Sequence, residues 1–252
     1  MVKSPTFVRK LQIKMDEDIF GQAIHDYHVG QYTEDIKTYS SLDEEDVIPV
    51  PYLFRDFDAM PPLEKKALSL CKGKILDIGC GAGSHSLYLQ NKGYMVTGLD
   101  RSERAVETCR LRGLSHTVIS DIFTFNNGPF DTLLMLMNGI GIVGELRYLG
   151  EFLTHLKTLL RPGGQVLLDS SDIIYMFESD EDDGGYWIPD TPAYYGEVTF
   201  TMHYKKNRTP PFQWLYVDYN TLQRAALHAD FHCELVGEGS HYDYLARLSL
   251  PL

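Results

Sequence analysis

The sequence predicts an α/β fold: a doubly wound, mostly parallel seven-stranded sheet with helices on both faces. Three observations lead to this prediction. Short apolar segments alternate with helical segments between residues 74 and 172. These apolar segments are almost free of polar residues, which is typical of strands covered on both faces. A glycine-rich turn at residues 79–83 follows the first of them, where nucleotide-like ligands bind in open α/β sheets.

The first 70 residues precede this alternation and are predicted to form a helical cap. Residues 16–40 indicate a helix that mixes aromatic side chains with histidine and aspartate. An acidic connector containing prolines follows. A second helix is expected over residues 61–71, because two prolines suit its first turn.

The alternating segments from residue 74 onward are predicted to be βαβ units. Strands are expected at residues 74–78, 94–100, 116–121, 130–137 and 165–172. The intervening helices are expected at residues 84–93, 102–113 and 145–160. Gly93 and Gly113 end two of these helices, and Ser102 caps one at its start.

The alternation stops after residue 172. Residues 196–206 and 211–219 alternate polar and apolar side chains at a period of two, so they predict a β-hairpin. A helix over residues 221–231 and two closing strands follow. We therefore predict one domain over residues 1–252, with the cap at 1–70 and an inserted lid or hairpin at 175–219.

Composition excludes several classes of partner. Hydrophobic residues make up 44% of the chain, and the formal net charge is -12. That charge argues against a nucleic-acid partner, because non-specific affinity for nucleic acid comes from clustered lysine and arginine. The longest uncharged central stretch has 13 residues, whereas a membrane-spanning helix needs about 20. With no apolar leader segment and four scattered cysteines, we expect a cytoplasmic protein with free thiols and no membrane partner.

A metal site is not expected. His228, His232 and Cys233 have a spacing that could suit zinc, but the sequence indicates no fourth ligand. The acidic run at residues 178–183 lacks the glycine spacing of a calcium loop, so it is interpreted as a solvated loop.

Two ligand classes compete for the glycine turn. A dinucleotide-binding loop has the pattern G-x-G-x-x-G with an acidic residue about 20 positions later. Gly79 and Gly81 fit this pattern, and Asp100 lies 21 residues after Gly79. The third glycine of the pattern, however, would fall on Ser84, whereas the glycine is Gly83. A nicotinamide-dependent oxidoreductase therefore stays as an alternative.

The second class fits more positions. The segments LDIGCGAG, GLD, SD, FDTLLMLMNG and LRPGG follow one another in the order and at the spacing found in class I S-adenosylmethionine-dependent methyltransferases, which this chain resembles. In that family an acidic residue ends the first strand, as Asp77 does here. The resemblance assigns the ribose hydroxyls to Asp100, and the adenine to Asp121 with Ile122 beside it.

The resemblance implies that S-adenosyl-L-methionine is the cofactor and S-adenosyl-L-homocysteine the product. One carboxylate can accept hydrogen bonds from two vicinal ribose hydroxyls, which agrees with the role assigned to Asp100. The cofactor-binding candidates are Asp77, Gly79, Gly81, Gly83, His85, Asp100, Arg101, Asp121, Ile122, Met137 and Asn138.

The methyl acceptor is expected to approach from the carboxyl ends of the fourth and fifth strands. Methyl transfer is an in-line displacement, so positioning alone can lower its barrier, and no catalytic residue is assigned. A small-molecule acceptor is predicted, and a protein that binds the donor without turnover remains an alternative. Candidate acceptor contacts are His25, Tyr27, Tyr32, Asn138, Asp172, Tyr175 and Trp187.

Overall fold

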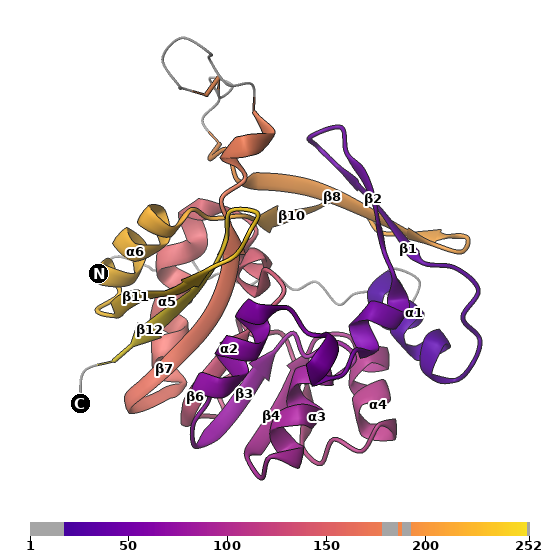
Figure 1. Cartoon of the computed structure of the whole chain (residues 1–252), viewed down its shortest axis with the longest axis horizontal. Coiled ribbons are helices and arrows are strands. Elements are labelled where there is room, and N and C mark those ends of the chain that lie inside the picture. Colours follow the sequence, from indigo (N-terminus) through magenta and orange to yellow (C-terminus); the bar gives the residue numbers. More distant parts are fainter. Residues whose placement is uncertain (1–17, 178–185, 188–192, 251–252) are drawn as a thin grey trace, which may run out of the picture.

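The computed structural model describes residues 18–177, 186–187 and 193–250. Its main sheet has seven strands in the order β11-β12-β7-β6-β3-β4-β5 (Figure 1). Five of them are mutually parallel: β3 (Lys74–Ile78), β4 (Met95–Asp100), β5 (Thr117–Ile119), β6 (Phe130–Met135) and β7 (Leu160–Ser171). At one edge β12 (Asp243–Ser249) pairs antiparallel with both β7 and β11 (His232–Glu238). The predicted doubly wound, mostly parallel seven-stranded sheet is confirmed.

Helices cover both faces of this sheet. The strands alternate side chains between two cores: Leu133 and Val166 point to one face, and the next residues, Leu134 and Leu167, point to the other. The first core is closed by helices α5 (Leu149–Thr158) and α6 (Tyr219–His228). The second is closed by α2 (Pro62–Leu70) and α3 (Ser84–Asn91), while α4 (Glu103–Leu111) packs beside β4 and β5. The described part of the chain contains no helix long and apolar enough to cross a membrane.

A second sheet combines two distant parts of the sequence. Its strands are β1 (Ile36–Ser40), β2 (Glu45–Ile48), β8 (Glu197–Tyr204), β9 (Asn207–Arg208) and β10 (Phe212–Leu215). They pair antiparallel in the order β10-β8-β1-β2, with β9 on β8. The predicted hairpin therefore exists, but its first strand also pairs with the N-terminal segment.

The first 70 residues were expected to form a helical cap, but this segment also contains the strands β1 and β2. Helix α1 (Ile19–His28) occupies only part of residues 16–40, and β1 occupies the end of that stretch. Strand β1 alternates buried and exposed side chains and is rich in residues that favour strands. Two short 3-10 helices, η2 (Val50–Phe54) and η3 (Phe57–Ala59), lead from β2 to α2. The N-terminal cap is thus a mixture of helices and strands.

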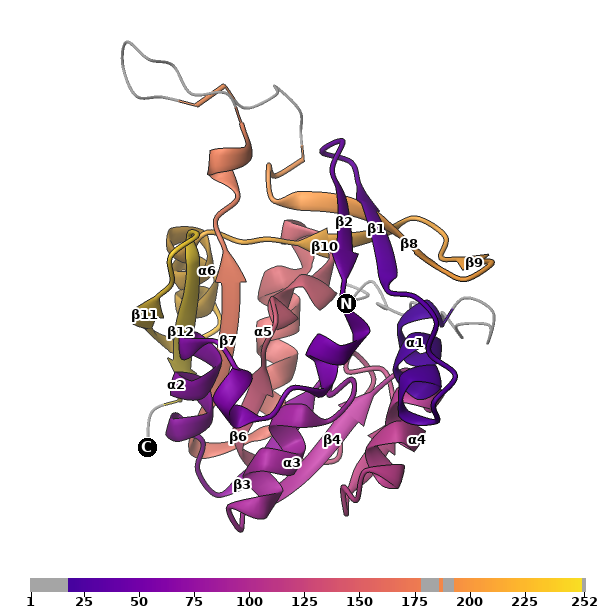
Figure 2. The same cartoon turned by 45° about the vertical axis from the view of Figure 1, so that its right-hand side comes forward.

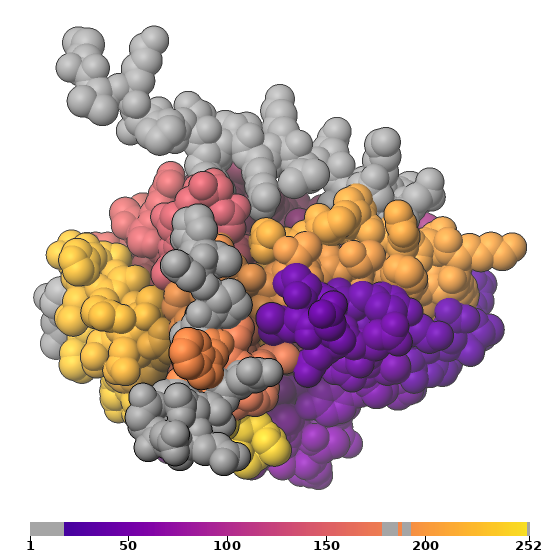
Figure 3. Space-filling model, turned by 90° about the horizontal axis from the view of Figure 1, so that it is seen from above, coloured from indigo at the N-terminus to yellow at the C-terminus, as the bar shows by residue number. Residues whose placement is uncertain are grey.

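The second sheet lies over the carboxyl ends of the main strands (Figures 1 and 2). Seen from above, the indigo β1–β2 segment and the orange β8–β10 segment lie side by side across this end of the molecule (Figure 3). At one end of β8, Tyr204 packs with Ile36 and Ile19 of α1. At the other end, β10 contacts the 3-10 helix η4 (Gly139–Val143), which follows β6.

Candidate functional site

The glycine turn after β3 is fixed to the end of β4. The backbone N–H groups of Gly79 and Cys80 donate to the carbonyl oxygen of Leu99, at 2.8 and 3.1 Å. Gly79, Gly81 and Gly83 all have positive φ angles, which glycine adopts without strain. A Cβ added at Gly79 would meet no heavy atom within 4 Å, whereas one at Gly83 would lie 2.8 Å from Cys109 Sγ. Gly79 therefore offers open backbone to a ligand, and Gly83 allows close packing on α4.

Asp77 ends the first strand beneath this turn. Its side chain is 2% exposed, and its Oδ2 accepts a hydrogen bond of 2.6 Å from Ser86 Oγ on α3. Burial raises the pKa of Asp77 above its ordinary value. The carboxylate thus joins the end of β3 to the helix that follows the glycine turn.

Asp100 lies at the end of β4, beside the same turn. Its Oδ2 accepts from the backbone N–H of Gly81 at 3.0 Å, and its Oδ1 accepts from that of Ser102 at 2.9 Å. A carboxylate has about four acceptor sites, so both oxygens retain capacity for another donor. Burial raises the pKa of Asp100. The next residue, Arg101, is exposed.

Asp121 and Ile122 follow β5. Asp121 Oδ1 accepts from the backbone N–H of Phe123 at 3.0 Å, which shapes the turn after the strand. Ile122 is 1% exposed, and its side chain belongs to the core beneath α5 and α6. The structure thus leaves the Asp121 carboxylate partly accessible and places the Ile122 side chain away from solvent.

The turn after β6 has an unusual backbone. Met137 and Asn138 both have positive φ, at 64° and 55°, which is rare for two successive non-glycine residues. Asp169, near the end of β7, accepts from the backbone N–H groups of Met137 and Gly139, at 3.0 and 3.4 Å. Burial raises the pKa of Asp169 to about 6. Asp169 lies at the end of the fifth predicted strand, where the acceptor was expected to approach, but no role was assigned to it.

The Asn138 side chain bridges the two sheets. Its Nδ2 donates to the carbonyl oxygen of Leu215 in β10 at 3.3 Å. Its Oδ1 is buried and has no hydrogen-bond partner. Buried polar atoms are rarely left unpaired, so this oxygen is a candidate contact for a ligand.

His85 takes part in a buried ionic network rather than lying open beside the glycine turn. Its Nε2 lies 2.8 Å from Glu64 Oε2, and Arg55 Nη2 donates to Glu64 Oε1 at 2.5 Å. Burial acts to raise the pKa of Glu64, but hydrogen bonds and charge from His85 and Arg55 outweigh it and hold that pKa below its ordinary value. The network joins the residue after η2 to α2 and α3.

Three of the predicted acceptor contacts lie in the N-terminal segment. His25 Nε2 lies 3.8 Å from Glu107 Oε2 on α4. The Tyr27 ring packs 4.6 Å from Phe54, and the Tyr32 hydroxyl donates to Asp35 Oδ1 at 2.6 Å. None of these three contacts joins His25, Tyr27 or Tyr32 to the carboxylates at the strand ends.

The remaining predicted acceptor contacts lie beyond β7. Asp172 Oδ1 accepts from the Tyr195 hydroxyl at 2.7 Å. Tyr175, in the 3-10 helix η6 (Ile174–Met176), stacks on Tyr242 at 5.1 Å. Trp187 is 68% exposed. The acidic run at residues 178–183 lies outside the described residues.

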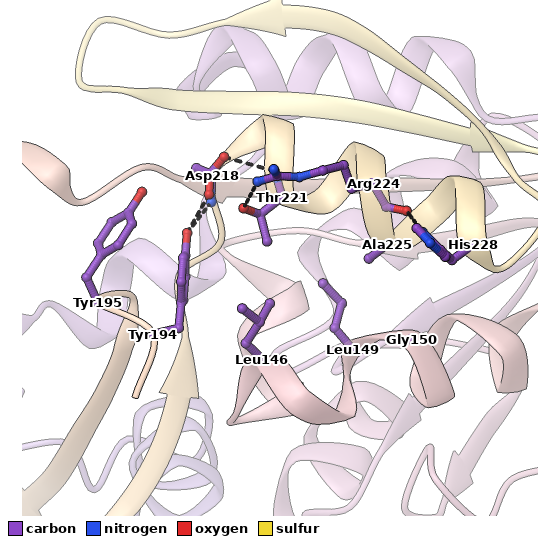
Figure 4. A pocket seen from close by; sticks show the side chains of 10 residues that line it. All are labelled: Leu146, Leu149, Gly150, Tyr194, Tyr195, Asp218, Thr221, Arg224, Ala225 and His228. Atoms are coloured by element: carbon purple, nitrogen blue, oxygen red, sulfur yellow. Dashed lines mark hydrogen bonds between the residues drawn. The ribbon is translucent and has the colours of Figure 1, made fainter. Parts of the chain in front are cut away.

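An open groove of about 630 Å³ lies between α6 and the start of α5, on the face of the main sheet that these helices cover (Figure 4). The Tyr194 hydroxyl donates to Asp218 Oδ2 at 2.7 Å at one end of it. The 3-10 helix η5 (Leu146–Tyr148) contributes to its floor. Its lining residues are Leu146, Leu149, Gly150, Tyr194, Tyr195, Asp218, Thr221, Arg224, Ala225 and His228. None of the cofactor-binding candidates lines this groove. Within the described residues, no three histidine, cysteine or acidic side chains are grouped to hold a metal ion.

Comparisons with known proteins agree with this arrangement. A methyltransferase-domain family model matches residues 75–164. An S-adenosylmethionine-dependent methyltransferase from Bacteroides fragilis, solved in complex with S-adenosyl-L-homocysteine, is 43% identical. The similarity covers 95% of this chain and 98% of that one, with a TM-score of 0.87. DesVI from Streptomyces venezuelae is 18% identical with a TM-score of 0.56, covering 81% of this chain and 96% of that one, which shows a shared fold.

Among curated relatives, a ubiquinone biosynthesis O-methyltransferase from Caulobacter sp. (strain K31) is 30% identical over 103 residues. This match covers 38% of the present chain and 39% of the relative, so the chain spans about two fifths of the length of that protein. The corresponding protein of Caulobacter vibrioides is 30% identical over 118 residues, covering 44% of this chain and 42% of the relative.

Proposed function

The chain belongs to the S-adenosylmethionine-dependent methyltransferases, and from this premise we propose that it methylates a small-molecule acceptor. The observation that carries the proposal is the open backbone of Gly79 beside the Asp100 carboxylate, whose two oxygens each retain acceptor capacity. Family membership disfavours the nicotinamide-dependent alternative. The net charge of -12 supports a small acceptor rather than a nucleic acid.

The residues at the strand ends fit an adenosyl donor. We assign the ribose hydroxyls to Asp100 and the adenine to Asp121 with the backbone of Ile122. The methionine part is assigned to Gly79, Gly81 and the turn at Met137 and Asn138. Asp77 and Gly83 shape the turn, because both are used in packing against helices. His85 is assigned a positioning role through Glu64, and Arg101 a peripheral charge.

When bound, S-adenosylmethionine supplies a methyl group on a cationic sulfur that a nucleophile displaces. The chain's contribution is to hold and orient both molecules and to exclude water. Two segments of the chain support the second task. Strands β1 and β2, within residues 1–70, and β8 to β10, within residues 175–219, form one sheet over the carboxyl ends of the main strands (Figures 1 and 2). We propose that these strands form the lid of a single domain over residues 1–252.

Calorimetric titration tests the donor assignment. The full chain is titrated separately with S-adenosylmethionine, S-adenosyl-L-homocysteine and NADH. We expect both adenosyl ligands to bind and NADH to give no heat of binding. Saturable binding of NADH without binding of either adenosyl ligand would contradict the proposal.

A further inference from the structure

Four aromatic side chains of the second sheet and its continuation form a cluster that we call the aromatic patch: Phe200, Phe212, Trp214 and Tyr216. Phe200 lies directly opposite Phe212 in the β8–β10 pairing, so the two share a face of the sheet. Trp214, two residues after Phe212, lies on that face too. The ring centroids are 6.3 Å apart for Phe200 and Phe212, 6.4 Å for Phe212 and Trp214, and 6.3 Å for Phe200 and Tyr216.

The aromatic patch is not part of the packed hydrophobic cores of the protein. Its four side chains are half-buried, and none belongs to a packed core cluster of the residues that the structure describes. On the same face of β8, Val198 and Tyr204 at the two ends are buried, at 1% and 0% exposure. The sheet is therefore packed at both ends of this face and keeps partly exposed rings between them.

This patch lies beside the ends of β6 and β7. A Cβ added at Gly141, in the 3-10 helix after β6, would lie 2.0 Å from Trp214 Nε1, so the indole packs directly on that backbone. Just after the patch, the backbone N–H of Val217 donates to Ser170 Oγ in β7 at 3.0 Å. The patch is thus fixed to both strands at whose ends the acceptor is expected.

Several polar groups lie at this point, among them Ser40, which pairs with Phe200 in the β1–β8 register. Asn138 donates to Leu215, between Trp214 and Tyr216, and its buried Oδ1 lacks a partner. The Asp169 carboxylate holds the same turn. The neighbours of Phe200 on its face of β8, Val198 and Met202, are both apolar. A flat aromatic ring packs well on these aromatic faces and edges.

We propose that the acceptor is a planar aromatic molecule carrying a hydroxyl or amino group, with its ring against the aromatic patch and its polar hydrogen toward Asn138 Oδ1. This inference rests on the proposed function, since it places the acceptor at the donor's edge of the sheet. It names the class of acceptor that the methyltransferase would take.

Binding of 2-naphthol tests the inference. The full chain, saturated with S-adenosyl-L-homocysteine, is titrated calorimetrically with 2-naphthol, with decahydro-2-naphthol as a non-planar match and with glucosamine as a sugar. We expect 2-naphthol to bind at least tenfold more tightly than either comparison compound. Equal or weaker binding of 2-naphthol would overturn the inference.

Variants on the two faces of the second sheet localise the effect. Phe212→Ala should weaken 2-naphthol binding at least tenfold, and Phe212→Leu, which keeps apolar volume, should weaken it less. Tyr39→Ala is the matched control, because Tyr39 lies opposite Thr201, on the other face of β8. Unchanged binding in Phe212→Ala, or an equal loss in Tyr39→Ala, would overturn the inference.

Donor binding separates the two proposals. If wild-type protein fails to bind S-adenosyl-L-homocysteine, the proposed function is wrong. If it binds this ligand but does not prefer 2-naphthol, only the acceptor inference is wrong. Should Phe212→Ala lose S-adenosyl-L-homocysteine binding through misfolding, the wild-type preference among the three compounds still decides.

Discussion

Asp100 is the residue on which donor binding depends most directly in this proposal. We expect Asp100→Ala to weaken binding of S-adenosyl-L-homocysteine by about 1–3 kcal/mol, because charge-assisted hydrogen bonds to the ribose would be lost. Calorimetric titration measures the change. Glu151→Ala is the control, since Glu151 is an exposed carboxylate in the first turn of α5.

The same variant also removes two hydrogen bonds within the protein, from the N–H groups of Gly81 and Ser102. Asp100→Asn keeps an oxygen for one of them and therefore separates the effect of charge from that of the loop. An unchanged dissociation constant in Asp100→Ala, with the fold intact by circular dichroism, would remove Asp100 from the donor site.

The raised pKa of Asp169 predicts that the stability of the fold depends on pH. Its pKa in the folded protein is raised from 3.8 to about 6, so the folded state binds this proton more tightly than the unfolded chain does. Its stabilising contribution is complete below about pH 4 and is lost as the pH rises through about 6, with a slope of at most about 1.4 kcal/mol per pH unit. Urea unfolding of wild type and Asp169→Asn between pH 4 and 8 measures this.

We expect the difference in unfolding free energy between the two proteins to change across pH 4–6 and to become constant above about pH 7. Subtracting the variant cancels other buried carboxyls, such as Asp77 and Asp100, whose pKa values are raised in the same direction. A difference that is constant over the whole range would show that Asp169 does not titrate as the structure indicates.

Among the elements, the 3-10 helix η4 determines how the second sheet sits on the main sheet. Gly141→Ala places a Cβ against the Trp214 indole, at 2.0 Å in the present geometry, so the helix and β10 must separate. We expect a loss of about 1–3 kcal/mol of stability from this overpacking. Donor binding should weaken as well, because the Gly141 N–H donates to the carbonyl oxygen of Asn138, in the turn assigned to the methionine part of the donor. Thermal unfolding and titration with S-adenosyl-L-homocysteine measure the two effects.

Gly150→Ala is the matched control for this substitution. Gly150 lies in α5, and a Cβ there would meet no heavy atom within 4 Å. Because alanine favours helix over glycine, we expect this variant to be as stable as wild type or more stable. Equal stability of Gly141→Ala and Gly150→Ala would show that the packing of Trp214 does not require a glycine at residue 141.

The elements that sequence alone could predict are those with local signals. The βαβ units and the closing strands follow from apolar runs and capping residues, and the main sheet was predicted correctly. Strand β1 was missed because one of its partners, β8, lies more than 150 residues away in the chain, and the other, β2, has only four residues. A pairing of that kind leaves only a weak period-two signal in five residues, and the neighbouring helix α1 obscured it.

The same distinction applies to the candidate site. Asp77, Asp100 and Asp121 lie at the ends of predicted strands, so their place at one edge could be predicted. The hydrogen bonds of Asp169 to the turn after β6 depend on two strands meeting side by side. The aromatic patch depends on the β8–β10 register and on the packing of Trp214 against Gly141. Neither can be read from spacing along the chain.

At the scale of the whole molecule, the second sheet is assembled from two distant segments of the chain and is held to α1. Lys205 Nζ donates to Asp26 Oδ2 at 2.6 Å, and the Tyr204 hydroxyl donates to the same oxygen at 3.2 Å. Asp26 is 8% exposed, so its carboxylate is the buried partner of this contact. Because β1 and β8 pair along this part of the sheet, loosening the contact should affect both strands together.

We therefore predict that Asp26→Asn speeds hydrogen exchange in β1 and β8 by a similar factor of about five, corresponding to roughly 1 kcal/mol of lost local stability. Strands β3 and β6 should exchange as in wild type, because their hydrogen bonds lie in the main sheet. Exchange followed by mass spectrometry measures all four strands. His25→Ala is the control, since His25 is the preceding residue on α1 and makes only a long contact with the half-exposed Glu107. Faster exchange in β8 alone would show that the two segments do not open as one lid, and faster exchange throughout would show that Asp26 stabilises the whole fold instead.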